Sequence, residues 1–100
     1  MTHVLTERIK QWAIERDLQS ADPSKQILKL GEEYGELCES FLKGYPDATE
    51  DAIGDMYVVL TILCLQLDLD IEDCIEMAYE EIRDRKGKLV NGSFVKDSDL

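Results

Sequence analysis

The sequence predicts an all-α protein of four helices that ends in a short hairpin or tail. Apolar residues recur every three or four positions in four separate segments. The two prolines, Pro23 and Pro46, stand where the second and third segments begin, as is typical of the first helical position. Near the C-terminus, Asn91-Gly92 lies between two short apolar segments, which is the pattern of a β-hairpin.

The composition limits the class of protein. A chain of 100 residues, 44% hydrophobic and 33% charged, predicts one soluble globular domain. No apolar run reaches the roughly 18 residues of a membrane span, and the first residues contain no apolar block typical of a signal peptide, so we expect a cytoplasmic protein of a bacterium or phage-infected host, without a membrane partner. The net charge is −11, and residues 44–82 contain no Lys or Arg, which argues against nucleic acid as a partner.

The first helix is expected over about residues 6–16. Its Trp12 follows the apolar spacing, so we interpret it as a core residue and not as a stacking platform. The second helix is expected over about residues 23–42. Asp22 has the position of its N-cap, and Gly44 lies just past its end, where a left-handed residue often closes a helix.

The third helix is expected over about residues 48–67 and the fourth over about 71–86, with Asp70 as the N-cap of the fourth. The third helix is apolar nearly all round from Met56 onward, which is typical of a central helix or a subunit interface. Residues 88–100 form the tail. Because four helices of this size have a thin core, we expect a homo-oligomer, either a homodimer or a homotetramer.

The chain contains three cysteines, Cys38, Cys64 and Cys74, at spacings that form no C-x-x-C pair. Each falls within a helical pattern. We therefore expect reduced, partly buried thiols and no disulfide framework.

Two acidic clusters occupy the second and third expected helices. At 100° per residue, Glu33 and Glu36 flank the buried face of one helix, whereas Glu32 faces water. Asp51 and Asp55 share an otherwise apolar side of the next helix. Unpaired carboxylates near a core repel one another and are costly to bury, and no cation of the third helix pairs with them.

A hard divalent cation would explain these clusters. Mg²⁺ prefers oxygen ligands and keeps waters for a phosphate substrate, and Mn²⁺ can replace it. Gly35 and Gly54 each precede a candidate ligand inside a helix, where a missing side chain leaves room for close approach. The alternative is that the acids form solvated helix faces and that the glycines serve packing alone.

A basic segment follows the acidic helices and supplies candidate phosphate contacts, namely Arg83, Arg85 and Lys86. Lys86 continues the apolar stripe of the fourth expected helix and therefore points along its packed face. Gln26 and Lys29 lie on the acidic side of the second helix and can reach the same ligand. The alternative is that the basic residues complement the helix dipole at a C-terminus.

These motifs resemble those of the MazG-like nucleotide pyrophosphohydrolases of the all-α NTP pyrophosphatase superfamily. That family shares E-x-x-E followed by E-x-x-D; here Glu33-x-x-Glu36 fits the first half and Asp55 ends the second. The flanking segments 11–13 and 85–96 are similar to those of its small single-domain members, so the resemblance spans about residues 8–96. Ala52 stands where the family has Glu, and Asp51 is placed to substitute for it.

The resemblance implies a four-helix MazG-like bundle and Mg²⁺-dependent hydrolysis of a nucleoside triphosphate to its monophosphate and pyrophosphate. It implies that Glu33, Glu36 and Asp55 hold the metal with help from Asp51, and that Glu32 or Glu33 accepts the proton of the attacking water. Two other classes remain open. One is a non-catalytic helical interaction module with a degenerate metal site, and the other is an acidic mimic of nucleic acid.

Overall fold

The computed structural model describes residues 2–100, with side chains from His3 onward. It contains the four expected helices and the hairpin. In chain order the elements are α1 (Thr2–Glu15), the 3-10 turn η1 (Leu18–Ser20), α2 (Pro23–Lys43), α3 (Pro46–Gln66), α4 (Ile71–Ile82), β1 (Gly87–Val90), β2 (Ser93–Lys96) and the 3-10 turn η2 (Asp97–Asp99).

The predicted ends of α2 and the start of α4 are confirmed in their local geometry. The Asp22 carboxylate accepts a hydrogen bond from the Ser24 backbone N–H, with Pro23 following at the first helical position. Gly44 closes α2 in the left-handed conformation, at φ 74°. The Asp70 carboxylate accepts from the Glu72 backbone N–H at 2.8 Å. Each cap satisfies backbone groups that a helix end leaves without partners.

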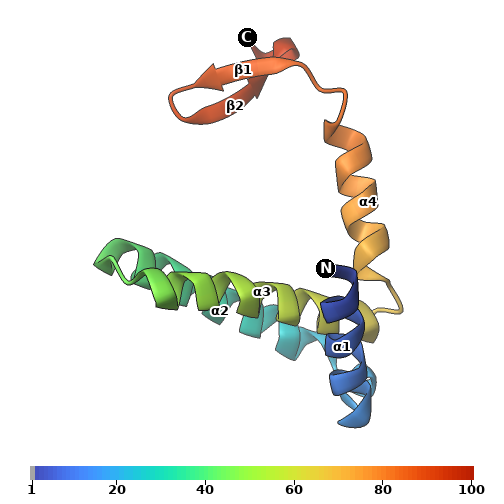
Figure 1. Ribbon diagram of the computed structural model, residues 1–100. Helices are drawn as coiled ribbons and strands as arrows, with labels where there is room; N and C mark the ends of the chain where they lie inside the picture. The colour runs from blue at the N-terminus through green and yellow to red at the C-terminus, as the bar shows by residue number, and fades with distance from the viewer. Residues whose placement is uncertain (1) are drawn as a thin grey trace.

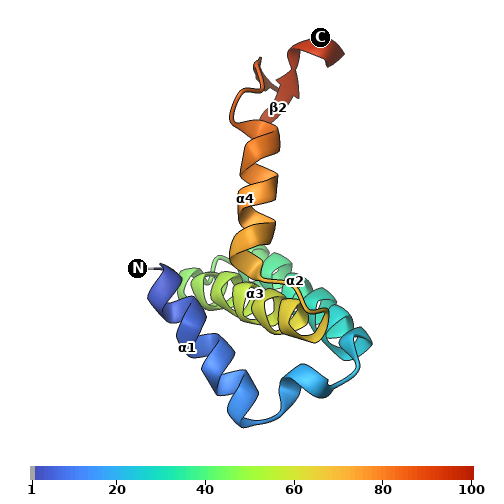
Figure 2. The same cartoon turned by 90° about the vertical axis from the view of Figure 1, so that its right-hand side faces the viewer.

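Helices α2 and α3 lie side by side and antiparallel, and α1 crosses α3 near one end of the pair (Figures 1 and 2). We call α1, α2 and α3 the body. Its buried apolar side chains include Ala13, Val59 and Ile62. The Thr6 hydroxyl, fully buried, lies 2.6 Å from the Tyr57 hydroxyl and joins α1 to α3. The expectation of a central third helix is confirmed, because α3 contacts α1, α2 and α4.

Helix α4 and the hairpin extend away from the body, and we call them together the arm (Figure 1). The four helices therefore do not close into a bundle within one chain. This differs from the four-helix bundle that the family resemblance implies. The apolar stripe of α4 begins at the buried Ile71 and continues through Ile75, Tyr79 and Ile82, which are exposed. A helix with such a stripe needs a second surface to cover it.

Helix α4 ends at Ile82, four residues earlier than predicted, which corrects the placement of Lys86. The Lys86 carbonyl accepts from the Asp97 N–H at 2.8 Å, so Lys86 belongs to the base of the hairpin. A side chain at Gly87 would clash with the Val95 carbonyl oxygen, which explains glycine at the start of β1. The predicted turn is confirmed, with Asn91 and Gly92 both at positive φ, 51° and 83°.

Two other helix starts differ from the prediction. Helix α1 begins at Thr2 and not near residue 6, because Thr6 is already anchored against α3 and the preceding residues contain no helix breaker. Helix α3 begins at Pro46, with Tyr45 as its N-cap residue. Across residues 2–100, no single helix has the length and apolar character of a membrane span; α3 and α4 reach it only together, and they are bent by 108°.

Replacing Val59 with Ala is expected to destabilise the protein by about 2 kcal/mol, because it removes buried methyl groups and leaves a cavity in the core. Val59 is 1% exposed, whereas Val4 on α1 is 49% exposed. Urea unfolding followed by circular dichroism measures the difference. Val4→Ala is the matched control and should change the stability little; equal effects of the two substitutions would contradict this description of the core.

Candidate functional site

Glu33, Glu36 and Asp55 meet where α2 lies against α3, and we call them the acidic cluster. One carboxylate oxygen of each lies within 4.8 Å of the others. Glu33 and Glu36 are three positions apart on α2, so both reach the same side of the helix. Glu33 is buried, Asp55 is half-buried and Glu36 is exposed. The structure thus brings together three of the four predicted metal ligands, in an arrangement open to solvent on one side.

Burial and mutual repulsion both act on the cluster. Burial, and then the charges of Glu36 and Asp55, raise the pKa of Glu33, while Lys29 at 3.8 Å from its Oε1 acts in the opposite sense. Burial, and then the neighbouring Asp51, raise the pKa of Asp55. The Oε2 atom of Glu33 is buried without a hydrogen-bond partner. An unpartnered buried carboxylate oxygen beside two further carboxylates fits a cation, and hard divalent cations prefer oxygen ligands.

Asp51, the fourth predicted ligand, is exposed one turn before Asp55 on α3. Ala52, where the resembled family has Glu, is 3% exposed. Asp51, Ala52 and Glu36 line a small hollow of about 290 Å³ beside the cluster. Asp51 is therefore next to the cluster and oriented so that it influences Asp55, while Ala52 contributes no ligand.

A larger cleft of about 740 Å³ opens on the other side of Asp55, between α1 and α3. Most of its wall is apolar, and one edge carries the carboxylates of Asp51 and Asp55. Arg8 is the cation at its edge. Among the residues whose side chains the structure describes, those lining it are Leu5, Arg8, Ile9, Trp12, Glu50, Asp51, Gly54, Asp55, Tyr57 and Val58. An apolar cleft with a few charged groups at one side is the usual form of a small-molecule site.

Trp12 and Arg8 were not predicted as site residues. The interpretation of Trp12 as core is wrong for this chain: it is 47% exposed, lines the cleft and has the Arg16 guanidinium 4.3 Å from its ring centroid. The signal was available in the sequence, because the helical spacing that places Trp12 next to Ile9 also places Arg8 on the same side of α1.

Gly35 and Gly54, the two helical glycines singled out in the sequence, have open surroundings within the chain. A Cβ at Gly35 or Gly54 would meet nothing within 4 Å among the atoms outside its own helix turn. Neither glycine is needed for a close contact within the chain. Gly54 instead forms part of the floor of the cleft, so a side chain there would occupy space that a ligand could use.

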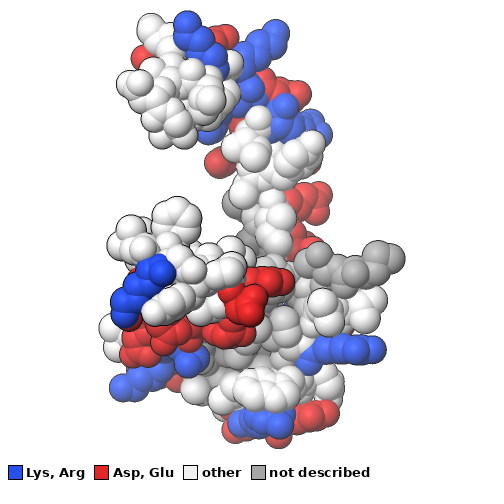
Figure 3. All heavy atoms as spheres, turned by 60° about the vertical axis from the view of Figure 1, so that its left-hand side comes forward, with Lys and Arg blue, Asp and Glu red and all other residues white. Residues whose placement is uncertain are grey.

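The other predicted site residues are scattered. Glu32 is exposed and lies outside the cluster, whereas Gln26 is half-buried on α2 with its Oε1 unpartnered. Arg83, Arg85 and Lys86 lie on the arm, where Arg83 pairs with Glu80 and Asp84. Figure 3 shows acidic side chains close together on the body, with basic ones among them, and several basic side chains at the hairpin end of the molecule. Within one chain, the structure does not bring these three basic residues to the acidic cluster.

Of the thiols, Cys64 is buried as expected, but Cys38 and Cys74 are exposed in the single chain. All three are free. The expectation of reduced cysteines agrees with this state, and the expectation that all are partly buried is wrong for Cys38 and Cys74.

Comparisons with known proteins give one informative relative. The chain is 46% identical over 67 residues to an uncharacterized 18.2 kDa protein in the rep-hol intergenic region of Haemophilus phage HP1. The similarity covers 66% of this chain but only 41% of that relative, so the chain spans less than half the length of the protein it matches. No protein family and no solved structure matches the chain.

In metal-free protein, Glu33→Gln is expected to raise the melting temperature by a few degrees near neutral pH. Because the folded state raises the pKa of Glu33 above its ordinary value of 4.5, the folded state binds this proton more tightly, and stability falls as the pH rises through the raised pKa. The advantage of Glu33→Gln over the wild type should vanish near pH 4.5 and grow above it. Scanning calorimetry in chelator across this range measures it, and an advantage independent of pH would contradict the assignment. Glu15→Gln, an exposed change of the same charge on α1, is the control.

Mg²⁺ is expected to raise the melting temperature of the wild type and not that of Glu36→Gln or Asp55→Asn. A cation at 100 times its dissociation constant contributes about 2.7 kcal/mol if it does not bind the unfolded chain. Thermal scans with millimolar MgCl₂, against matched ionic strength from NaCl, test this expectation. Glu15→Gln should respond as the wild type does; a response retained in both cluster variants would show that the ion binds elsewhere.

Proposed function

We propose that this protein is a Mg²⁺-dependent nucleoside triphosphate pyrophosphohydrolase that releases a nucleoside monophosphate and pyrophosphate. The single observation that carries the proposal is the acidic cluster, with its unpartnered buried Glu33 Oε2, opening directly onto an apolar cleft through the shared residue Asp55. The triphosphate of a nucleotide needs a cation between its negative charges and the carboxylates. Its nucleobase needs an apolar surface on which to bind. The resemblance of the two acidic motifs to MazG-like enzymes supports the same activity.

In this proposal Glu33, Glu36 and Asp55 hold the cation, and Asp51 supports Asp55 from the next turn. When bound, a divalent cation offsets phosphate charge and makes water more acidic. The geometry favours this set because the three oxygens already lie within 4.8 Å of one another before any ion binds. Mg²⁺ fits the all-oxygen ligand set, and Mn²⁺ would fit it as well.

The chain's own residues would divide the remaining work. The nucleobase would lie in the cleft against the side chains of Ile9, Trp12 and Val58. These side chains would exclude water from one side of the substrate. Arg8 would offset phosphate charge at the edge of the cleft, and Lys29 would orient Glu33. Water adds to the α phosphorus, pyrophosphate leaves, and the proton of the water passes to a carboxylate. Glu33 suits this acceptor role better than the exposed Glu32, because Glu33 lies within the acidic cluster and Glu32 lies outside it.

We further propose that the active form is a homo-oligomer in which the arm of one copy lies over the body of another. Residues 83–96 carry five basic residues and one acidic residue, a local charge of +4, whereas residues 2–66, which contain the body, carry twelve acidic and six basic residues, a charge of −6. These surfaces attract each other. The exposed stripe of α4 and the apolar wall of the cleft would be covered by the same contact. Arg83, Arg85 and Lys86 would then act on phosphate in the partner's site, which the arm cannot serve within its own chain.

One observation favours a second candidate function. The buried Ala52 removes a carboxylate from the motif that the resembled family uses, and a site with fewer ligands fits a structural cation in a non-catalytic interaction module. In that case Glu36 and Asp55 contribute to stability and to ion binding, and the protein does not hydrolyse nucleoside triphosphates.

Wild-type protein with Mg²⁺ is expected to convert at least one common or damaged ribo- or deoxyribonucleoside triphosphate to monophosphate and pyrophosphate. Glu36→Gln and Asp55→Asn should lower the rate by roughly 100-fold or more, the scale on which loss of a positioned group acts. Chromatography of the products measures both. Glu15→Gln should keep the wild-type rate. Cation binding without turnover across the whole panel would favour the interaction module.

Mixing two inactive variants is expected to restore activity if the arm acts on a partner copy. The variant Glu36→Gln lacks a cluster ligand, and the double variant Arg85→Ala, Lys86→Ala lacks the basic arm. In a mixed dimer one of the two sites regains both parts, so up to about a quarter of the wild-type rate should return on random mixing. Failure of the mixture, with sedimentation showing mixed oligomers, would contradict action in trans.

A further inference from the structure

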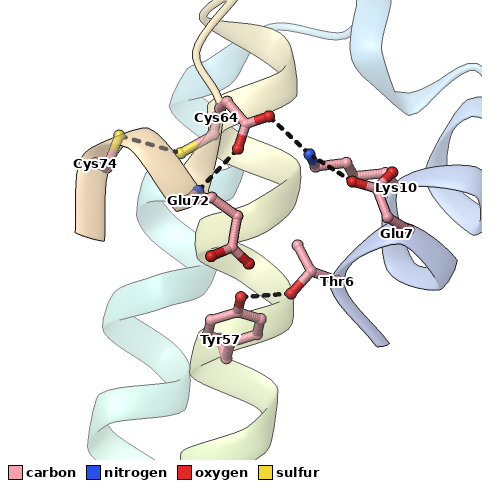
Figure 4. Close-up of polar contacts among 8 residues, drawn as sticks. Thr6, Glu7, Lys10, Tyr57, Cys64, Glu72 and Cys74 are labelled. Carbon is pink, nitrogen blue, oxygen red and sulfur yellow. Dashed lines mark hydrogen bonds and ion pairs between the residues drawn. The ribbon is translucent and has the colours of Figure 1, made fainter. Parts of the chain in front are cut away.

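The junction of α3 and α4 brings two thiols together. Cys64 lies in the last turn of α3 and Cys74 in the first turn of α4, and the sharp bend between the helices points both side chains to the same spot (Figure 4). Their sulfur atoms are 3.9 Å apart. The third cysteine, Cys38, lies on α2 and is exposed. Neither the acidic cluster nor the cleft uses any of the three.

The two sulfurs are already in contact, and only a small movement would join them. A disulfide needs about 2.05 Å between sulfurs. The two sulfur atoms must therefore approach each other by about 1.9 Å. Cys74 belongs to an exposed turn of a helix that meets the body only at its start. Rotation of its side chain is therefore the simplest way to close the distance, and the buried Cys64 can stay in place.

We propose that Cys64 and Cys74 are a redox modification site, at which oxidation forms a disulfide that fixes the arm to the body. The inference is independent of the proposed enzymatic function. It requires a disulfide oxidant of low molecular mass, such as oxidised glutathione. Intracellular disulfides are uncommon, and those that form there usually serve in redox sensing or catalysis.

The order of reaction follows from the two environments. Burial raises the pKa of Cys64 to about 11, so Cys64 is poorly nucleophilic near neutral pH, and the exposed Cys74 reacts first. The Cys74 thiolate attacks one sulfur of oxidised glutathione, and one glutathione leaves as a thiolate. Cys64 then loses its proton to water and attacks the Cys74 sulfur, and the second glutathione leaves. Two protein thiols are oxidised, and one small disulfide is reduced to two thiols.

Such a bond would act on the part of the molecule that is least constrained. The first turn of α4 is held to the body by the buried Ile71 and by the Lys10–Asp70 ion pair, with 2.9 Å between Nζ and Oδ2. Beyond Cys74 the helix extends away. A covalent bond between residues 64 and 74 closes a short ring around the bend, so the direction in which α4 leaves the body becomes fixed.

The test uses the full chain, incubated with oxidised glutathione or with dithiothreitol. Thiol titration of the Cys38→Ser variant should fall from two free thiols to none, its intact mass should drop by two hydrogen atoms, and peptide mapping of the wild type should recover a 64–74 crosslink. Cys38→Ser is the matched control and should form the same crosslink, while Cys74→Ser should form none. Amide hydrogen exchange across residues 71–82 should slow by roughly tenfold in the oxidised wild type and remain unchanged in α2.

Two results would overturn the formation of the disulfide, and a third would overturn its effect on the arm. One is a stable glutathione adduct on Cys74 with Cys64 still reduced at equilibrium. The other is oxidation that proceeds only through Cys38, as covalent dimers that Cys38→Ser abolishes. A crosslink that forms without slowing exchange in α4 would overturn the fixing of the arm. Because Cys74 is exposed, Cys74→Ser should fold normally, and its reduced melting temperature, measured beside the wild type, verifies this.

Discussion

The crowding of three carboxylates at the contact between α2 and α3 is the constraint on which the rest of the structure depends. Two packed helices normally fill such a contact with apolar side chains, and here Glu33 takes one of those places with an oxygen that has no partner. The raised pKa values of Glu33 and Asp55 record the electrostatic cost of this arrangement. Without a compensating cation, repulsion among Glu33, Glu36 and Asp55 acts directly against the helix pair that forms the body.

Helix α3 connects the acidic cluster to the other parts of the molecule. It supplies Asp55 to the cluster, Gly54 and Val58 to the cleft, and Cys64 to the junction with the arm. The same helix carries Val59 and Thr61 into the small core. Its apolar character on nearly every side is therefore explained by three neighbours and a cleft, whereas the apolar stripe of α4 beyond Ile71 stays exposed in the chain.

Much of the fold was predictable, because its signals are local. Proline and capping residues placed the starts of α2 and α4, and Asn91-Gly92 placed the hairpin turn. The end of α4 was not predictable in this way, since Lys86 is drawn from the helix by a hydrogen bond to Asp97, which depends on the hairpin being formed. The direction of the arm was not predictable for the same reason: helical periodicity says which face is apolar and nothing about what covers it.

The candidate site, too, was predictable only where its residues could be grouped from their positions along the helices. Glu33, Glu36 and Asp55 could be grouped from their positions on two neighbouring helices, and the structure brings them together. The cleft could not be deduced, because it depends on the angle at which α1 crosses α3. Trp12 was therefore assigned to the core, although it stands at the mouth of a cavity. The basic residues were assigned to the same ligand from chemistry alone, and within one chain the arm keeps them apart from it.

The central claim is that the acidic cluster binds a divalent cation, and Mn²⁺ titration followed by NMR tests it most directly. Paramagnetic broadening reports the position of the ion independently of any activity. The account predicts that the first amides to broaden are those around Glu33, Glu36 and Asp55, at Mn²⁺ concentrations well below the protein concentration, and that excess Mg²⁺ reverses the effect. Broadening spread evenly over the exposed acids of α1, α4 and the tail would contradict it.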